Sequence, residues 1–188
     1  MPIETELKLR VESHEEVRRR LQEADASLIE TGLETNRIYD RPDGSLRKRG
    51  CGLRLRSVLF ADGKESRATL TFKGPRRAMA FKSREELEVG VDDADAMERL
   101  MEGIGFVQVL RYQKRRESWQ LDECRVDLDE PARIGLFVEI EGPDERTIRR
   151  VQHKLKLDGQ GDVAPTYVGM LVAFCKANGI TSRTLDLP

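Results

Sequence analysis

The sequence has few of the features that mark membrane, secreted or zinc-binding proteins. No apolar run approaches the roughly 20 residues of a membrane-spanning helix, and the first residues lack the basic and apolar segments of a signal peptide. The three cysteines, Cys51, Cys124 and Cys175, are scattered and form no C-x-x-C pair. We therefore expect a cytoplasmic protein with reduced thiols, no structural zinc and no membrane partner.

Net charge is also nearly absent, although charged residues are abundant. They make up 36% of the 188 residues, but 33 Lys and Arg balance 34 Asp and Glu, which leaves a net charge of −1. Without a field of one sign, nucleic acid is not an expected partner, and any electrostatic function must depend on local arrangement. The length suits one domain over residues 1–188, and no low-complexity stretch or linker divides it.

What the sequence does contain is strict alternation of charged and apolar residues. At the two-residue period of a β-strand, residues 4–11 place acids and bases on one face and apolar side chains on the other. Two glutamates share one strand face here and in two later strands, each of which precedes a predicted helix. The three pairs are Glu4 with Glu6, Glu86 with Glu88, and Glu139 with Glu141. Each helix needs an apolar surface, so the charged faces are expected to point away from the helices.

Further strands place basic side chains in the same alternating way. The basic residues of these charged faces are Lys8, Arg54, Arg56, Lys73, Arg84, Lys114 and Arg116. Another strand, at 124–129, places Asp127 and Asp129 opposite apolar positions. Residues 34–41 are predicted as a strand that ends in the turn Pro42-Asp43-Gly44. About eight such strands with short breaks favour closure of the sheet. We expect an α+β fold: an eight-stranded antiparallel closed β-barrel, a tunnel with a charged interior and helices packed outside.

The charged face indicates a ligand, because burying so many ions costs several kcal/mol each unless they are paired, solvated or bound. Carboxylates suit Mg²⁺ or Mn²⁺, and arginine and lysine suit phosphate oxygens, so a polyphosphate bound with a metal fits best. A single E-x-E-x-K strand is usually a solvated edge, whereas several in one phase favour a functional face. The basic stretch 76–83 is either a loop that covers an anionic ligand or a solvated connection.

Taken together, these motifs resemble the CYTH superfamily, also called triphosphate tunnel metalloenzymes. This superfamily groups class IV adenylate cyclases, thiamine triphosphatases and inorganic triphosphatases. The resemblance covers nearly the whole chain. It rests on E-x-E-x-K at 4–8, Tyr39-Asp40, L-R-x-R at 53–56, F-K-G-P at 72–75, R-x-E-x-E at 84–88, Lys114 with Arg116, and E-x-E at 139–141.

The resemblance implies roles for the charged residues. The acids would hold one or two Mg²⁺ or Mn²⁺ ions, foremost Glu4, Glu6, Glu139 and Glu141, with Glu86, Glu88 and Asp127 on the same face. The bases would contact the phosphates. Lys8 is also a catalytic candidate, and Tyr39 with Lys73 matches the Tyr–Lys dyad of the thiamine triphosphatase branch. One departure is at Tyr167, which is followed by Val168-Gly169 where the family often has an acid.

Two reactions share such a site. In hydrolysis water attacks the terminal phosphorus, and in cyclisation the ribose 3′-oxygen attacks the α-phosphorus and releases pyrophosphate. The sequence has no recognisable adenine-reading motif, so we favour hydrolysis of tripolyphosphate or thiamine triphosphate over cyclisation of ATP. A non-catalytic module that binds polyphosphate or triphosphate-bearing RNA is a further alternative. The sequence leaves a homodimer open.

Overall fold

The computed structural model describes residues 3–61, 67–75 and 82–188, with the side chains of residues 3, 4 and 82–84 outside the description. The stretch 76–83, predicted as a basic loop, therefore falls almost entirely outside the described residues. The elements are β1 (Ile3–Val11), α1 (His14–Glu23), β2 (Ser27–Asp40), α2 (Ser45–Lys48), β3 (Gly52–Phe60), β4 (Arg67–Lys73), β5 (Lys82–Val91), α3 (Ala94–Gly103), β6 (Val107–Leu121), β7 (Cys124–Pro131), β8 (Leu136–Gly142), α4 (Glu145–Lys154), α5 (Tyr167–Ala177) and β9 (Thr184–Leu185).

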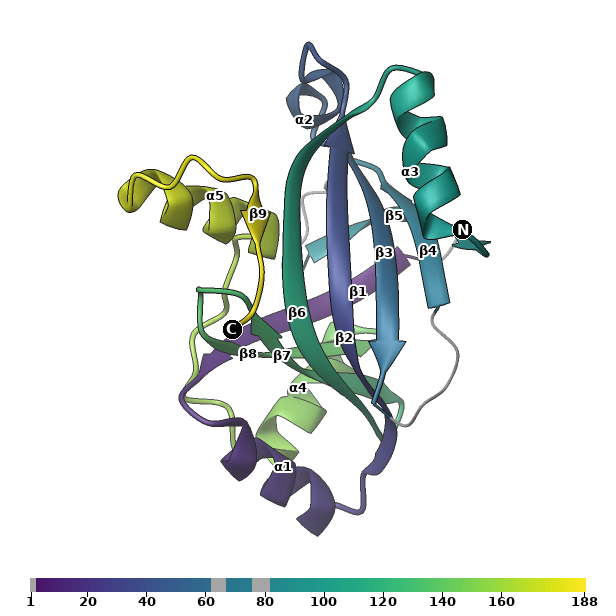
Figure 1. The fold of residues 1–188 in the computed structure, drawn as a ribbon. Coiled ribbons are helices and arrows are strands. Elements are labelled where there is room, and N and C mark those ends of the chain that lie inside the picture. The colour runs from purple at the N-terminus through teal and green to yellow at the C-terminus, as the bar shows by residue number, and fades with distance from the viewer. Residues whose placement is uncertain (1–2, 62–66, 76–81) are drawn as a thin grey trace.

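One antiparallel sheet dominates the fold. In hydrogen-bonding order its strands are β2, β3, β4, β5, β1, β8, β7 and β6, and β6 also pairs with β2, so each of these strands has two neighbours. Figure 1 shows β2, β3 and β6 side by side, with β1 crossing behind them at a steep angle. The predicted α+β class and antiparallel sheet are confirmed. A tunnel through the sheet stays a prediction, because strand pairing does not show the space that the strands enclose.

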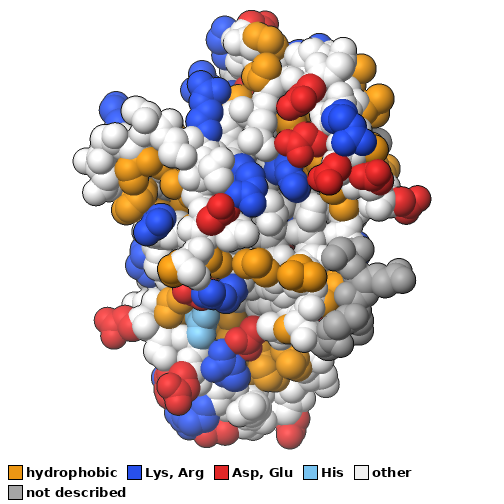
Figure 2. Space-filling model, in the orientation of Figure 1, with side chains coloured by type: hydrophobic (Ala, Val, Ile, Leu, Met, Phe, Trp, Pro, Cys, Tyr) orange, Lys and Arg blue, Asp and Glu red, His pale blue; other side chains and the backbone are white. Residues whose placement is uncertain are grey.

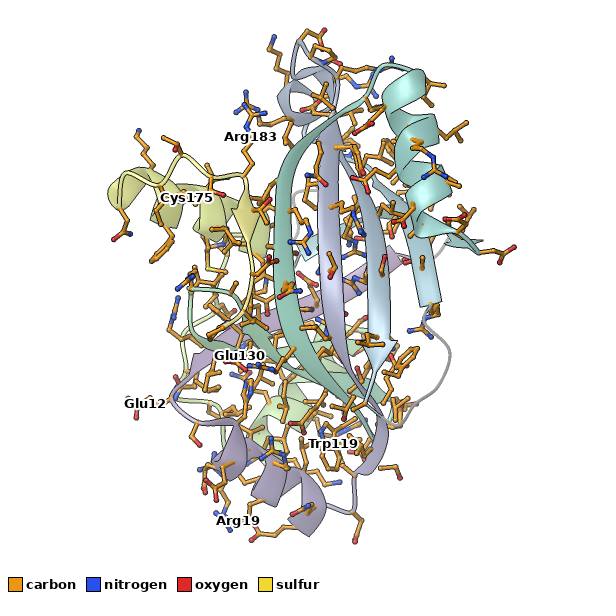
Figure 3. All side chains as sticks on the ribbon, viewed as in Figure 1. Glu12, Arg19, Trp119, Glu130, Cys175 and Arg183 are labelled. Atoms are coloured by element: carbon orange, nitrogen blue, oxygen red, sulfur yellow. The ribbon has the colours of Figure 1, made fainter. Side chains whose placement is uncertain are left out.

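Helices α1 and α4 lie on the apolar face of β1, β7 and β8, which we call the helix face. Leu7 and Leu9 of β1 share one buried cluster with Leu21 of α1 and Ile148 of α4. Trp119 belongs to the same cluster and lies at the α1 end of the molecule (Figure 3). The prediction that helices cover the apolar side of the acidic strands is confirmed for β1 and β8, but it is wrong for much of β5, where Leu87 and Val89 are exposed. Trp119 is a packing residue, as its apolar surroundings require.

Side chains at the helix starts fix where the main helices begin. Ser13, Asp93, Asp144 and Thr166 each accept a hydrogen bond from a backbone N–H in the first turn of α1, α3, α4 and α5. The sequence Ser13-His14-Glu15-Glu16 has the form of a capping box, but only the Ser13 half is made, because the Glu16 carboxylate bonds to arginines one turn further along the helix. The predicted strand-to-helix units are therefore present with their boundaries set by caps.

Helix α5 is placed differently from the prediction. Its residues Tyr167 and Leu171 are buried with Leu110, Tyr112 and Phe137, which stand on the charged side of their strands. The short strand β9 pairs in parallel with β6 and holds this helix beside the sheet (Figure 1). The expectation that the helices pack only on the apolar side is therefore wrong for α5, because these strands carry apolar residues at one end of the charged face.

Several element boundaries also differ from the sequence prediction. Strand β2 begins at Ser27, whereas alternation predicted a strand only from Glu34. The added residues include Leu28 and Ile29, which are both exposed, so burial does not alternate there. Helix α2 follows the predicted turn and is held by Asp40, whose carboxylate accepts backbone N–H groups of the helix. Neither the first part of β2 nor helix α2 has the alternation of apolar and polar residues that marks a half-buried strand.

The described part of the chain contains no helix long and apolar enough to cross a membrane. Cys51, Cys124 and Cys175 are all free thiols, as predicted. On the face drawn in Figure 2, acidic and basic side chains are both present and neither sign covers the surface, which agrees with the balanced net charge.

Candidate functional site

Arg116 lies at the centre of the charged side of the sheet, which we call the polar face. Its guanidinium nitrogens lie 2.6 Å from Asp127, 2.5 Å from Asp129 and 2.7 Å from Glu139. Burial opposes its charge, but Asp127 and Asp129 outweigh burial and raise the pKa of Arg116 well above its ordinary value. Arg116 was predicted to contact phosphate, yet in this structure it holds the acids of β7 and β8 together.

Asp127, predicted as a metal ligand, has both carboxylate oxygens engaged. Oδ2 lies 2.6 Å from Arg116, and Oδ1 accepts hydrogen bonds from Arg125 at 3.0 Å and from Ser118 at 2.6 Å. Arg125 also contacts Glu30 of β2 at 3.0 Å. A metal ion would have to replace these partners, so the structure places Asp127 in an ion-pair network.

A second group of charges surrounds Glu34 of β2. Its carboxylate lies 3.1 Å from Arg56, 3.2 Å from Lys114 and 3.7 Å from Arg116. Burial alone would raise the pKa of Glu34, but the positive charges of Arg56, Lys114 and Arg116 lower it far below its ordinary value. Asn36 accepts a further hydrogen bond from Arg56 at 3.0 Å. Two predicted phosphate ligands, Arg56 and Lys114, therefore share one buried acid.

Two lysines predicted to contact phosphate are almost fully buried. Lys114, 1% exposed, lies 3.2 Å from Glu34 and 3.0 Å from Asp129, and burial lowers the pKa of its ammonium. Lys8, 4% exposed, lies 3.0 Å from Glu139. Because each ammonium already faces a carboxylate, a phosphate would bind here by taking the place of a carboxylate oxygen.

Arg54 differs from the other bases because its charge is poorly compensated. Its Nε is buried without a hydrogen-bond partner among the residues that the structure describes. One terminal nitrogen donates to Thr71 at 3.3 Å, and the Glu88 carboxylate is 3.9 Å away. Burial and the adjacent Arg56 lower the pKa of Arg54 to about 10. A guanidinium that has a buried donor without a partner among the described residues is chemically suited to bind an anion.

The remaining predicted residues of β4 and β5 form a separate group. Lys73 forms an ion pair with Glu86, its cross-strand neighbour. Glu88 accepts a hydrogen bond from a threonine of β4, and its side chain is 53% exposed. Glu4 and Arg84 are backbone partners where β1 meets β5, but their side chains lie outside the described residues.

Glu6 and Glu141 are direct cross-strand partners on β1 and β8. Burial, with Asp127 and Glu6 nearby, raises the pKa of Glu141. Glu141 also borders a pocket of about 460 Å³ together with Arg125. The rest of this pocket is lined by Gln120, Glu123, Gly142 and Pro143. Two facing carboxylates beside an open pocket are chemically suited to a divalent cation, since like charges in one place favour a shared counterion.

A complete metal site is not visible in the described part of the chain. No three Asp, Glu, His or Cys side chains within those residues are close enough to hold an ion. The oxygen donors of Glu6 and Glu141 fit Mg²⁺ or Mn²⁺, and Glu139 is two residues away on the same strand face. Binding of the metal by these acids and Glu4 stays a prediction.

The structure separates Tyr39 from Lys73, which the family resemblance paired as a catalytic dyad. Tyr39 is buried with Leu55 of β3 and Met101 of α3, on the side of the sheet opposite the polar face. Burial raises the pKa of its phenol. Lys73 stands on the polar face with Glu86, so the backbone of the sheet lies between the two side chains. Tyr39 is therefore a packing residue in this structure and the dyad is not formed.

Most of the chain matches a known protein family. Residues 2–160 match the family model of the CYTH domain. The chain belongs to the CYTH domain family. This CYTH protein is 26% identical over 139 residues to a Methanocaldococcus jannaschii protein whose name proposes an adenylate cyclase, covering 74% of this chain and 76% of that one.

Solved structures with a similar fold include proteins from Pyrococcus horikoshii and Hippeastrum. A Pyrococcus horikoshii protein superposes with a TM-score of 0.78 at 25% identity, covering 91% of this chain and 99% of that chain. A proposed adenylyl cyclase from Hippeastrum, described as having a dominant triphosphatase activity, superposes with a TM-score of 0.70. Its identity is 19%, with 93% of this chain and 96% of that chain covered, so this second likeness shows the fold alone.

Sequence reasoning missed several residues of the CYTH polar face. Glu34, Asp129 and Tyr167 each contact predicted site residues. Alternation placed Asp129 on the strand face of Asp127, but Asp129 was not included among the predicted ligands. Glu34 and Tyr167 had no such signal, since their roles depend on which strands and helix come together.

The buried charge of Glu34 predicts a loss of stability in acid. Its pKa is lowered on folding, so its contribution to stability is present above the unfolded pKa of about 4.5 and is lost as pH falls toward the folded value. Below pH 4.5, the pH dependence that Glu34 contributes should lower the free energy of unfolding by about 1.4 kcal/mol for each pH unit. Urea unfolding measured across this range should therefore show a shallower pH dependence for Glu34→Gln than for the wild type. Equal slopes would contradict the lowered pKa.

Proposed function

We propose that this CYTH protein is a divalent-metal-dependent enzyme that hydrolyses a triphosphate bound on the polar face. The observation that carries this proposal is the buried Arg54 guanidinium, whose Nε has no partner among the described residues. Arg56 and Lys114 lie in the same part of the sheet and add positive charge. An anion of high charge density would supply the negative charge that Arg54 lacks. The enclosed tunnel predicted from the sequence is part of this proposal.

Hydrolysis is favoured over cyclisation by the packing of the aromatic residues. Tyr112, Phe137 and Tyr167 stand on the polar face but are buried against one another in the α5 cluster. Within the described residues they therefore offer no open ring face to a purine. Hydrolysis of tripolyphosphate or thiamine triphosphate requires only residues that bind the phosphate groups. The triphosphatase activity described for the Hippeastrum protein supports the same choice.

In the proposed reaction, the oxygen of a water molecule forms a bond to the terminal phosphorus and the bridging P–O bond to that phosphorus breaks. Diphosphate leaves from tripolyphosphate, or thiamine diphosphate from thiamine triphosphate, as one proton is released. Arg54 and Arg56 would bind the non-bridging oxygens and stabilise the charge that develops on the leaving oxygen. Lys8 and Lys114 would exchange a carboxylate partner for a phosphate oxygen. Positioning and charge neutralisation supply the rate enhancement, without a covalent nucleophile.

Mg²⁺ or Mn²⁺, when bound, would neutralise phosphate charge and orient water. Glu6 and Glu141 would hold the ion, with Glu139 and Glu4 as further predicted ligands. In the described geometry Glu139 is also the ion-pair partner of Lys8 and Arg116. Glu139 would therefore contact both the metal and the bases that bind phosphate.

The test is turnover of defined triphosphates with and without metal. Purified protein with Mg²⁺ or Mn²⁺ is expected to release phosphate from tripolyphosphate or thiamine triphosphate, and to form little cyclic AMP from ATP. Chelation with EDTA should abolish the activity, because the phosphate charge is then unscreened. Phosphate, pyrophosphate and cyclic AMP are measured in parallel for each substrate.

Two outcomes would decide against the proposal. Cyclic AMP and pyrophosphate as the main products from ATP would establish the cyclase instead. No turnover of any triphosphate with either metal, together with tight binding of tripolyphosphate, would indicate a binding module. Glu141→Gln serves as the matched variant, since it keeps the side-chain shape, and it should lose metal-dependent turnover while remaining folded.

A further inference from the structure

Tyr167 is the first residue of α5 and lies outside the part of the chain that matches the CYTH family model. Its ring centroid is 3.8 Å from Nζ of Lys8 and 5.5 Å from Nζ of Lys114. Its hydroxyl donates a hydrogen bond to Asp129 at 2.9 Å. One side chain from the C-terminal helix therefore contacts two of the predicted phosphate ligands and an acid of the central network.

The chain just before α5 holds the backbone of the same lysine. The Val163 N–H donates to the Lys8 carbonyl at 2.8 Å, and Asp162 forms a β-bridge with Leu9. Lys8 is thus fixed at its backbone by residues 162–163 and at its ammonium by Tyr167. Only a few residues separate these two contacts, so they act as one clamp on Lys8.

The Lys8 ammonium lies between two different partners. Glu139 is 3.0 Å away and the Tyr167 ring is 3.8 Å away. A carboxylate attracts the ammonium strongly and competes with a phosphate oxygen, whereas the face of an aromatic ring attracts a cation without using its hydrogen-bond donors. The ring therefore restricts the ammonium in space without itself occupying an N–H group.

We propose that Tyr167 is a positioning residue that holds the Lys8 ammonium in the orientation needed for phosphate, and that its ring rather than its hydroxyl performs this role. The helix α5 is kept in place by β9 and by Leu185, which is buried in the same cluster. The C-terminal segment outside the family match thereby contributes to the site. The kinetic part of this inference rests on the proposed hydrolysis, but the geometric part does not.

The geometric part is tested by NMR on protein labelled with ¹³C-lysine. A proton near the face of an aromatic ring resonates upfield, so the Lys8 ε-methylene should give a shifted signal, assigned by its loss in Lys8→Arg. The shift should persist in Tyr167→Phe and disappear in Tyr167→Leu. Val168→Ala, which trims the next residue of the same helix, should leave the shift intact. An unshifted signal in the wild type, or a shift that survives in Tyr167→Leu, would overturn the proposal.

The kinetic part uses tripolyphosphate with Mg²⁺. Tyr167→Leu should lower kcat about tenfold with KM changed less than about twofold, while Tyr167→Phe keeps most of the wild-type kcat. Equal losses in both variants would assign the effect to the hydroxyl and overturn the role of the ring. If the wild type turns over no triphosphate, the proposed hydrolysis fails, and the NMR result still decides whether Tyr167 holds Lys8.

Discussion

Replacing Arg54 by Met is expected to lower kcat/KM for triphosphate hydrolysis by about 100- to 1,000-fold and to raise the free energy of unfolding by about 1 kcal/mol. The activity falls because the substrate loses a guanidinium donor inside a desolvated site. The stability rises because Arg54 is buried with its Nε unpartnered among the described residues and with a pKa lowered to about 10. Steady-state kinetics and urea unfolding of the same preparations measure both effects.

Arg37→Met provides the matched control for this prediction. Arg37 stands on β2 with a side-chain exposure of 16%, close to the 15% of Arg54, but it faces α3 and contacts Glu98 at 3.2 Å. Its loss should leave kcat/KM unchanged. If Arg54→Met keeps wild-type activity, Arg54 does not bind the substrate. If it loses stability together with activity, the guanidinium is structural and the proposed anion site is wrong.

Replacing Arg116 by Met is expected to lower the free energy of unfolding by about 3–5 kcal/mol, because it leaves several buried carboxylates without their counterion. Those carboxylates belong to Asp127, Asp129 and Glu139, all within 2.7 Å of its guanidinium. Equilibrium urea unfolding, monitored by circular dichroism, measures the change. This expectation is the opposite of that for Arg54, although both were predicted as phosphate ligands.

Arg125→Met is the control that shows whether the loss of stability in Arg116→Met depends on the burial of the arginine or only on its positive charge. Arg125 contacts Glu30 and Asp127, each at 3.0 Å, but its side chain is 37% exposed. Solvent screens this arginine, so its loss should cost only about 1 kcal/mol. A stable Arg116→Met protein with weakened triphosphate binding would restore Arg116 to the role of phosphate ligand.

Alternation in the sequence was sufficient to find the strands and to sort most of their faces. In β1 and β8 charged and apolar residues mostly alternate, with Thr5 and Phe137 as exceptions, so the common face of Glu6 and Glu141 followed from the sequence. The same pattern predicted which helices cover the apolar side. These features depend on local periodicity, which a single chain displays directly.

Contacts between strands could not be predicted in this way. In β2 the residues on both faces are polar, with Glu34 on one side and Arg37 and Tyr39 on the other, so alternation does not fix which face Tyr39 occupies. The ion pairs of Arg116 depend on the register between β6 and β7, which the sequence does not specify. For this reason the sequence indicated many charged residues of the polar face but not their ion pairs.

The position of α5 and β9 has a consequence for where this protein can be divided. The family match ends at residue 160, but Tyr112 and Phe137 within it are buried against Leu171 and Leu185 beyond it. A fragment that ends at residue 160 would therefore leave Tyr112 and Phe137 without the side chains that bury them. The folded unit of this protein extends past the end of the family match, as far as β9.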